Sequence, residues 1–224
     1  MQKVKIIYKD IQNIILRVKP SLEVVLSVPK DASAKEIEYV LHKRKDWIEK
    51  RMEEFKRYFP LSRELISGED IFYLGKRYRL KVLSSKVERV ELKGGYLEVS
   101  VRDKKDYQHK EALIKAWYQQ KAKSHFKELL DKYTALLGCN QIQTFRIKEM
   151  KTRWGSCNPA KAYINLNLEL IKKDKKAIEY VVLHELAHLE HPNHSRDFWD
   201  FVKLYMPDYQ ERRKLLNQTT HISN

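Results

Sequence analysis

The residues of this chain best suited to chemistry are two histidines four positions apart, with a glutamate next to the first. In the segment His184-Glu185-Leu186-Ala187-His188, a helix would place both imidazoles on one face, where they can bind one metal ion. Glu185 would be rotated about 100° from His184, beside the ion, where it can hold a water molecule. With one further protein ligand a fourth position stays open, which distinguishes catalytic from structural zinc sites. The pattern therefore predicts a catalytic zinc site.

Two further histidines compete to be the third ligand. His191 would lie on the same helix face as His184 and His188 if the helix continued, but Pro192 follows it directly. The residue before a proline avoids the helical conformation, so we expect the helix to end near His191. His194 follows a turn at Pro192-Asn193, and it is our predicted third ligand, with His191 as the alternative.

The chemistry expected here is hydrolysis. Zinc bound by three neutral histidines keeps its full charge and lowers the pKa of a bound water to about 7. Glu185 would accept the proton of this water and then pass it to the leaving group. A second group usually stabilises the oxyanion that forms. The sequence leaves four candidates for the oxyanion stabiliser, namely Arg153, Tyr180, His191 and Tyr205.

The segment Trp154-Gly155-Ser156-Cys157 has two interpretations. As an edge strand beside the cleft, it could bind an extended peptide by strand addition. As a packed β-turn, it would have a structural role only. We assign Cys157 neither a metal-binding nor a nucleophilic role, because the three-histidine set is already complete.

The sequence pattern of residues 1–105 predicts a β-rich N-terminal region with one inserted helix. Period-two apolar patterns run through residues 3–9, 12–18 and 21–28, and strands resume at 71–74, 77–82, 87–92 and 96–101. A capping box from Ser33 to Glu36 opens a helix expected to end before Pro60. Glycines between the later strands mark their turns: Gly75, Gly94 and Gly95.

The charged stretch 102–106 is the expected boundary to a second region, residues 106–224. An apolar stripe predicts a long helix that ends at Gly138. Strands are expected around 143–147 and 163–168, then the histidine helix capped by Asp174, and a last helix that begins at Ser195. This order of elements predicts an α+β fold.

Composition limits the class of protein and its partners. The 224 residues are 42% hydrophobic and 33% charged, and no apolar stretch is long enough to span a bilayer. The first residues indicate a β-strand rather than a signal peptide, and two cysteines do not suggest a disulfide framework, so we expect a cytoplasmic protein. The net charge of +15 favours anionic partners and allows non-specific contact with nucleic acid. The sequence does not give the oligomeric state.

Several motifs occur in the order typical of a known family. They are Tyr73-Leu74-Gly75-Lys76-Arg77-Tyr78-Arg79-Leu80, Trp117-Tyr118, Lys151-Thr152-Arg153-Trp154-Gly155-Ser156-Cys157, Leu166-Asn167, the histidine helix from Glu179 to Leu189, Asn193-His194-Ser195, Phe198-Trp199 and Pro207-Asp208-Tyr209. In these motifs the chain resembles the YgjP-like metallopeptidases, relatives of the SprT-like zinc proteases, over nearly its whole length.

The resemblance implies metal ligands at His184, His188 and His194, and a catalytic Glu185. It also implies a small zincin-type α+β domain after the β-rich region, with peptides or proteins as substrates. The turn at 158–162 departs from the family, which often has a glycine there. The histidine spacing equals that of metzincins, but His191 stands where metzincins have a glycine, so we do not assign the chain to them.

Three functions stay open on the sequence alone. The first is a zinc-dependent hydrolase, in particular a metallopeptidase with Glu185 as general base. The second is a metal-dependent nucleotide pyrophosphatase of the UTP type, an activity also associated with the family, although no phosphate-binding glycine loop is visible. The third is a non-enzymatic nucleic-acid or protein-binding module with a structural zinc. Glu185 argues against the third, because a structural site needs no base.

Overall fold

The computed structural model describes residues 4–19, 22–58, 64–138 and 144–217. The chain divides into two compact units, Met1–Arg63 and Glu64–Asn224. The described residues form three small mixed sheets and six α-helices, which is the α+β class expected from the sequence. In this part of the chain, no helix is both long and apolar enough to cross a membrane.

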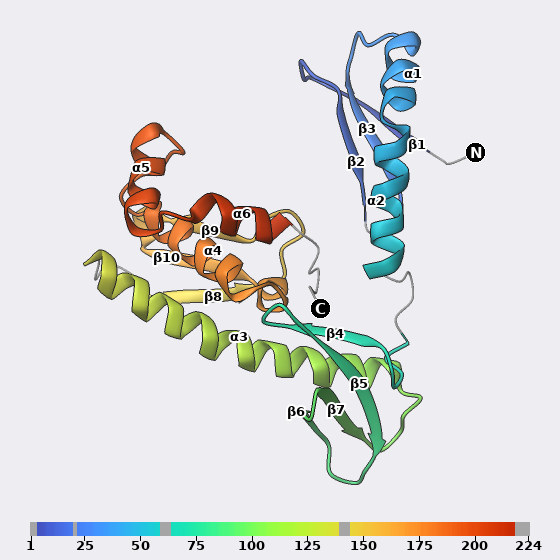
Figure 1. The fold of residues 1–224 in the computed structure, drawn as a ribbon, viewed down its shortest axis with the longest axis vertical. Helices are drawn as coiled ribbons and strands as arrows, with labels where there is room; N and C mark the ends of the chain where they lie inside the picture. Colours follow the sequence, from blue (N-terminus) through green and yellow to red (C-terminus); the bar gives the residue numbers. More distant parts are fainter. Residues whose placement is uncertain (1–3, 20–21, 59–63, 139–143, 218–224) are drawn as a thin grey trace. The chain divides into compact units, whose positions relative to one another are not determined.

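The first unit is a three-stranded sheet followed by two helices (Figure 1). Its elements are β1 Val4–Lys9, β2 Ile15–Val18, β3 Val24–Pro29, α1 Ala34–Lys43 and α2 Lys45–Tyr58. The three strands occupy the segments predicted from their period-two patterns. β3 lies between the other two, parallel to β1 and antiparallel to β2. Leu26 and Val28 of β3 and Ile37 of α1 form the buried core of this unit.

The helix predicted after the capping box is interrupted. Ser33 caps α1 as expected: its hydroxyl accepts from the Glu36 N–H at 3.3 Å, and its own N–H donates to the Glu36 carboxylate at 2.8 Å. The prediction of a single helix was wrong, because Arg44 leaves the helical conformation with a φ of −105° and a ψ of 11°. Neither glycine nor proline stands there, so the sequence carried no signal for the break.

The second unit begins with four strands and a long helix. These are β4 Asp70–Tyr73, β5 Lys76–Ser84, β6 Arg89–Lys93, β7 Tyr96–Val101 and α3 Tyr107–Leu137, with the strands in the order β4-β5-β7-β6. Gly138 ends α3 in the left-handed conformation, with a φ of +65°, as its sequence position predicted. The predicted division after residue 105 falls between β7 and α3, inside this unit, and stays a prediction.

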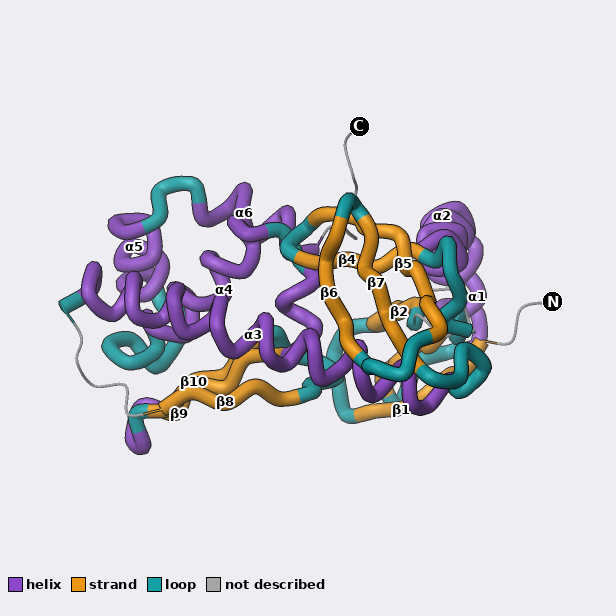
Figure 2. The backbone as a smooth tube through the Cα atoms, turned by 90° about the horizontal axis from the view of Figure 1, so that it is seen from below, coloured by secondary structure: helices purple, strands orange, loops and turns teal. Residues whose placement is uncertain are grey.

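The remaining elements surround the histidine segment. They are β8 Thr144–Lys148, β9 Gly155–Asn158, β10 Tyr163–Asn167, α4 Lys175–Ala187, α5 Arg196–Tyr205 and α6 Tyr209–Asn217, with 3-10 helices at Pro159–Lys161 and Leu168–Lys172. β10 is the central strand, parallel to β8 and antiparallel to β9, so β9 lies at the edge of its sheet. The long helix α3 runs past both this sheet and α4 (Figure 2). Fully buried side chains from four elements share one core: Phe126, Leu166, Val182 and Phe198.

The three sheets share one strand topology. In each, the third strand of a consecutive trio is central, parallel to the first strand and antiparallel to the second, in the orders β1-β3-β2, β5-β7-β6 and β8-β10-β9. After the three trios the chain continues into α1, α3 and α4 respectively, the last of them after the 3-10 helix Leu168–Lys172. The sequence shows no internal repeat that would indicate this, because alternation predicts strands but not their order.

The turn between β4 and β5 fixes the start of the histidine helix. Gly75 has a φ of +78°, and a Cβ at this position would lie 2.8 Å from Cα of Asp174. The neighbouring Leu74 N–H donates to the carbonyl of Ile171 at 2.9 Å. Asp174 caps α4 by accepting from the Lys176 N–H at 2.8 Å, which confirms the predicted cap. The turn motif therefore holds the N-terminal end of α4 in place.

Glu179 ties α4 to α3 and α6. Its carboxylate accepts from the Tyr133 hydroxyl at 3.0 Å and pairs with the Arg212 guanidinium at 2.5 Å. Arg212 also donates to Asp208 at 2.9 Å. Burial by itself raises the pKa of Glu179, but the hydrogen bonds from Arg212 and Tyr133 outweigh it and hold this pKa below its ordinary value.

We expect Glu179→Gln to lower the free energy of unfolding by about 1.5–3 kcal/mol at neutral pH, because charge-assisted hydrogen bonds are lost. The carboxyl has a lower pKa in the folded than in the unfolded chain. Its contribution is therefore present above the ordinary value of 4.5 and is lost as the pH falls through the folded-state pKa. Urea unfolding of the metal-free proteins at neutral and acidic pH measures both effects. Glu128→Gln, at an exposed position, should not change the free energy of unfolding at either pH. If Glu179→Gln lost the same stability at both pH values, the ionised Glu179 carboxylate would not be the stabilising group.

Ala162 is a strained residue in the turn at 158–162. It adopts the left-handed conformation, with a φ of 45° and a ψ of 46°, which costs a non-glycine residue about 1–2 kcal/mol. We therefore expect Ala162→Gly to raise the free energy of unfolding by about 1 kcal/mol in urea titrations. Ala160→Gly, in the same turn but at a position without a positive φ, should not stabilise the protein. Equal effects of the two substitutions would argue against this account.

Candidate metal centre

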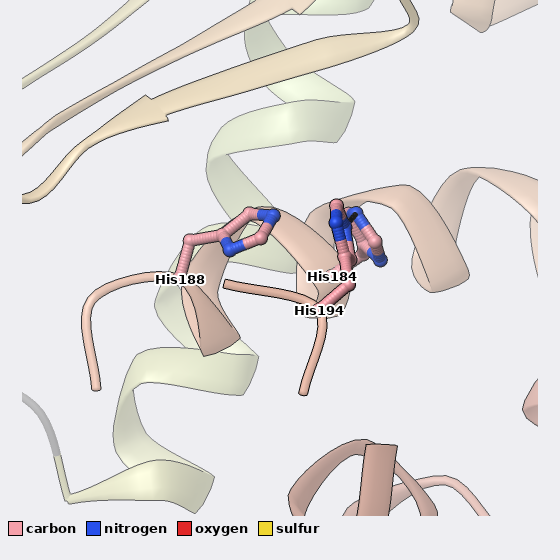
Figure 3. A group of neighbouring side chains, drawn as sticks. All are labelled: His184, His188 and His194. Atoms are coloured by element: carbon pink, nitrogen blue, oxygen red, sulfur yellow. Dashed lines mark hydrogen bonds between the residues drawn. The ribbon is translucent and has the colours of Figure 1, made fainter. Parts of the chain in front are cut away.

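Three histidines converge at the C-terminal end of α4 (Figure 3). His184 lies in the last turn of α4, His188 is its C-cap, and His194 directly precedes Ser195, the N-cap of α5. One ring nitrogen of each histidine lies within 4.8 Å of those of the other two, and the Nε2 atoms of His184 and His194 are 3.0 Å apart. The structure thus brings together the three residues that the sequence singled out as ligands.

His191 lies outside this cluster but helps to orient it. Its N–H donates to the Ala187 carbonyl at 2.9 Å, and the chain leaves the helix before Pro192, as expected. Its carbonyl lies 3.1 Å from Nδ1 of His188, so a proton on Nδ1 leaves Nε2 of that ring free to bind a metal. The ring of His191 packs on Phe201, 5.1 Å between centroids.

The first turn of α5 forms the aromatic surroundings of the cluster. Ser195 caps α5 by accepting from the Phe198 N–H at 3.4 Å. The ring of Phe198 lies 4.7 Å from that of His188, and Trp199 stacks on His194 at 5.6 Å with an interplanar angle of 22°. Phe198 also packs on His184, 5.0 Å between ring centroids, so aromatic rings of α5 contact all three imidazoles.

The histidine cluster fits a metal ion in both charge and spacing. Burial lowers the pKa of His184 to about 3, with smaller contributions from His188 and His194, and burial also lowers the pKa of His188. Neutral imidazoles offer the lone pairs that a metal needs. Two nitrogens bound to one tetrahedral zinc at 2.0–2.1 Å lie roughly 3.4 Å apart. The Nε2 atoms of His184 and His194, 3.0 Å apart, are close to that spacing, and the ligand atoms of all three histidines lie within 4.8 Å of one another.

Glu185 lies beside the histidines, buried against strand β9. Its side chain is in such close contact with Gly155 that a Cβ there would lie 2.5 Å from Oε1 and 2.6 Å from Cγ of Glu185. Glu185 is 6% exposed. Burial raises its pKa to about 7, against the opposing charge of Arg153.

An open cleft of about 830 Å³ runs over these residues. Its walls include Gly155, Ser156 and Cys157 of β9, together with Trp199 of α5 and Arg213 of α6. Two of the four candidates for oxyanion stabilisation, Arg153 and Tyr180, line the cleft, whereas the other two do not. Tyr205 packs on Phe201 instead, 5.0 Å between ring centroids.

The comparison with protein families decides the affiliation of the chain. The model of the YgjP-like metallopeptidase domain matches residues 12–219. The chain belongs to the YgjP-like metallopeptidase family. The family affiliation and the histidine cluster agree in pointing to a metal-binding protein.

Solved structures similar to this YgjP-like chain include two archaeal metallopeptidase zymogens. Abylysin of Pyrococcus abyssi is 25% identical, with a TM-score of 0.37, and the match covers 40% of this chain and 89% of that one. Jannalysin of Methanocaldococcus jannaschii is 23% identical, with a TM-score of 0.38, and the match covers 42% and 88% of the two chains. No functionally curated protein matches the chain.

Cys157 lines the cleft of this YgjP-like domain but has the properties of an inert thiol. Burial and the nearby Glu185 raise its pKa to about 12, so it carries no thiolate at neutral pH. Its exclusion as metal ligand and nucleophile stays a prediction.

Sequence reasoning did not find Arg213. It follows Arg212, and the local sequence does not distinguish two neighbouring arginines on a basic helix. In the structure they differ: Arg212 pairs with Glu179, whereas Arg213 lines the cleft. The sequence carried no signal for this difference, because it depends on how α6 packs beside α4.

Proposed function

We propose that this protein is a zinc-dependent peptidase. The observation that carries the proposal is the convergence of three histidines beside a buried glutamate, in a cleft bordered by an edge strand. His184, His188 and His194 would hold the metal. When bound, zinc would supply a Lewis acid that lowers the pKa of water to about 7 and polarises a carbonyl.

Glu185 would be the general base. Its carboxylate takes a proton from water as the water oxygen forms a bond to the peptide carbon, and it returns the proton to the nitrogen as the C–N bond breaks. Burial raises the pKa of this carboxyl in the metal-free protein, which favours its accepting a proton. Contact with Gly155 keeps the carboxyl group at the cleft.

Strand β9 would bind the substrate. Gly155, Ser156 and Cys157 line the cleft, and among the described residues β9 pairs only with β10. An extended peptide can add to such a free edge through main-chain hydrogen bonds. Arg153 or Tyr180, both in the cleft, would stabilise the oxyanion.

Metal analysis combined with activity assays tests the proposal. We expect one zinc per chain by elemental analysis, cleavage of casein, loss of cleavage with a chelator and recovery with added zinc. Hydrolysis of nucleoside triphosphates without proteolysis would instead support the pyrophosphatase. Bound zinc without either activity, together with DNA binding, would support the structural module. Nucleic-acid contact stays a prediction from the net charge of +15.

A further inference from the structure

Two arginines that form no ion pair among the described residues border the cleft. Arg153 and Arg213 both line it and are exposed, and neither has a carboxylate within 4.0 Å among the described residues. Glu185 is the one acidic side chain among the described residues of the cleft wall. The charge of Arg153 acts on Glu185, but the two arginines outnumber this one carboxylate, so the cleft wall keeps an excess of positive charge.

Arg213 is held in position by aromatic stacking. Its guanidinium lies over the ring of Trp199, 5.4 Å from the centroid. Trp199 in turn stacks on His194 and, at 5.4 Å with an interplanar angle of 20°, on Tyr209. Such stacking orients the planar guanidinium and leaves its N–H groups free to donate in the plane. Arg213 is thus linked to a candidate ligand through a single aromatic ring.

Arg153 comes from a different wall of the cleft. It stands two residues before Gly155, the residue that Glu185 contacts. A peptide paired with β9 would therefore have one cation at the start of that strand, and the second cation of the same cleft comes from α6. Both cations lie within the cleft that holds the reacting groups.

We infer that Arg153 and Arg213 form a subsite for an acidic side chain, Asp or Glu, next to the scissile bond of a peptide substrate. This inference rests on the proposed peptidase function, and it assigns Arg153 to the substrate side chain, which leaves Tyr180 as the oxyanion stabiliser. Guanidinium groups bind carboxylates through paired hydrogen bonds, and the edge of β9 supplies main-chain partners for a peptide. A nucleoside triphosphate fits less well, because the chain has no glycine-rich loop to surround its phosphates.

Peptide binding tests the subsite independently of turnover. The zinc-loaded Glu185→Gln protein is titrated with fluorescein-labelled hexapeptides in which one Asp is moved through an alanine background, each compared with its Asn counterpart. At low salt, Asp is expected to tighten binding about tenfold at one position or more. Adding Arg213→Gln should remove most of this preference. Adding Lys214→Gln, an equal loss of charge at the neighbouring exposed position outside the cleft wall, should retain it.

Different outcomes separate this inference from the peptidase proposal. Equal binding of Asp and Asn peptides, or equal effects of the Arg213 and Lys214 substitutions, would overturn the subsite. A nucleoside triphosphate that binds more tightly than every Asp peptide, through Arg213, would overturn the assignment to peptides. An Arg213-dependent preference for Asp, together with no cleavage of the same peptides by the wild type, would support the subsite and reject the peptidase.

Discussion

Glu185→Gln is expected to lower kcat for peptide hydrolysis by about 10²–10⁴-fold while the protein keeps its zinc. Glutamine has nearly the same volume as glutamate and fits the same space against Gly155, but it cannot accept a proton from water. Contacts other than Glu185 orient the histidines: His188 is held by the His191 carbonyl, His194 stacks on Trp199, and His184 packs on Phe198 at 5.0 Å between ring centroids. Steady-state kinetics and elemental analysis of the same preparations give the two quantities.

Glu190→Gln is the matched control for this prediction. Glu190 lies in the same segment but is exposed, and it does not line the cleft. Its substitution should leave both kcat and zinc content unchanged. A Glu185→Gln protein that loses its zinc would show that Glu185 helps to hold the metal, and one that keeps full activity would exclude it as the base.

Gly155→Ala is expected to reduce kcat by about 10²-fold or more with the zinc retained. The added Cβ would lie 2.5–2.7 Å from three atoms of Glu185, so the carboxyl group must move. A displacement of about 1 Å of a catalytic group can cost this much in rate. Because Glu185 is buried, its side chain cannot simply turn into solvent, and we expect overpacking to lower stability by about 1–3 kcal/mol.

Thr152→Ala controls for a change of side chain in the same motif. Thr152 is exposed and outside the cleft wall, so kcat should stay at the wild-type level. Wild-type turnover by Gly155→Ala would show that Glu185 does not need its present position. A protein that loses zinc together with activity would place the effect at the histidines instead.

The sequence predicted the histidine cluster well because each step depends on local geometry. The spacing of His184 and His188 follows from the helical period. Pro192 ends the helix, and the turn that follows brings His194 close to the other two histidines. Arg213 lines the cleft because of how α6 packs beside α4, and no local sequence pattern encodes this packing. The break at Arg44 was missed for the same reason, because no residue there is incompatible with a helix.

Alternation and glycine turns located the strands but not their partners. The edge position of β9, on which the substrate-binding proposal depends, follows from the pairing of β10 with both β8 and β9. Strand order is set by packing over the whole unit, so the sequence left the edge strand and the packed turn as equal alternatives. The structure decides for the edge strand.

The shared topology of the three sheets has a consequence for how the molecule is built. Every strand finds its partners within one short stretch of chain, residues 4–29, 70–101 or 144–167. Closing such loops costs little chain entropy, and contacts near in sequence favour rapid folding. The cleft has no comparable local origin, because it exists only where β9, α4, α5 and α6 meet. Gly155 and Arg213 therefore join Glu185 and the histidines, which are neighbours in sequence, only when β9 and α6 pack against α4.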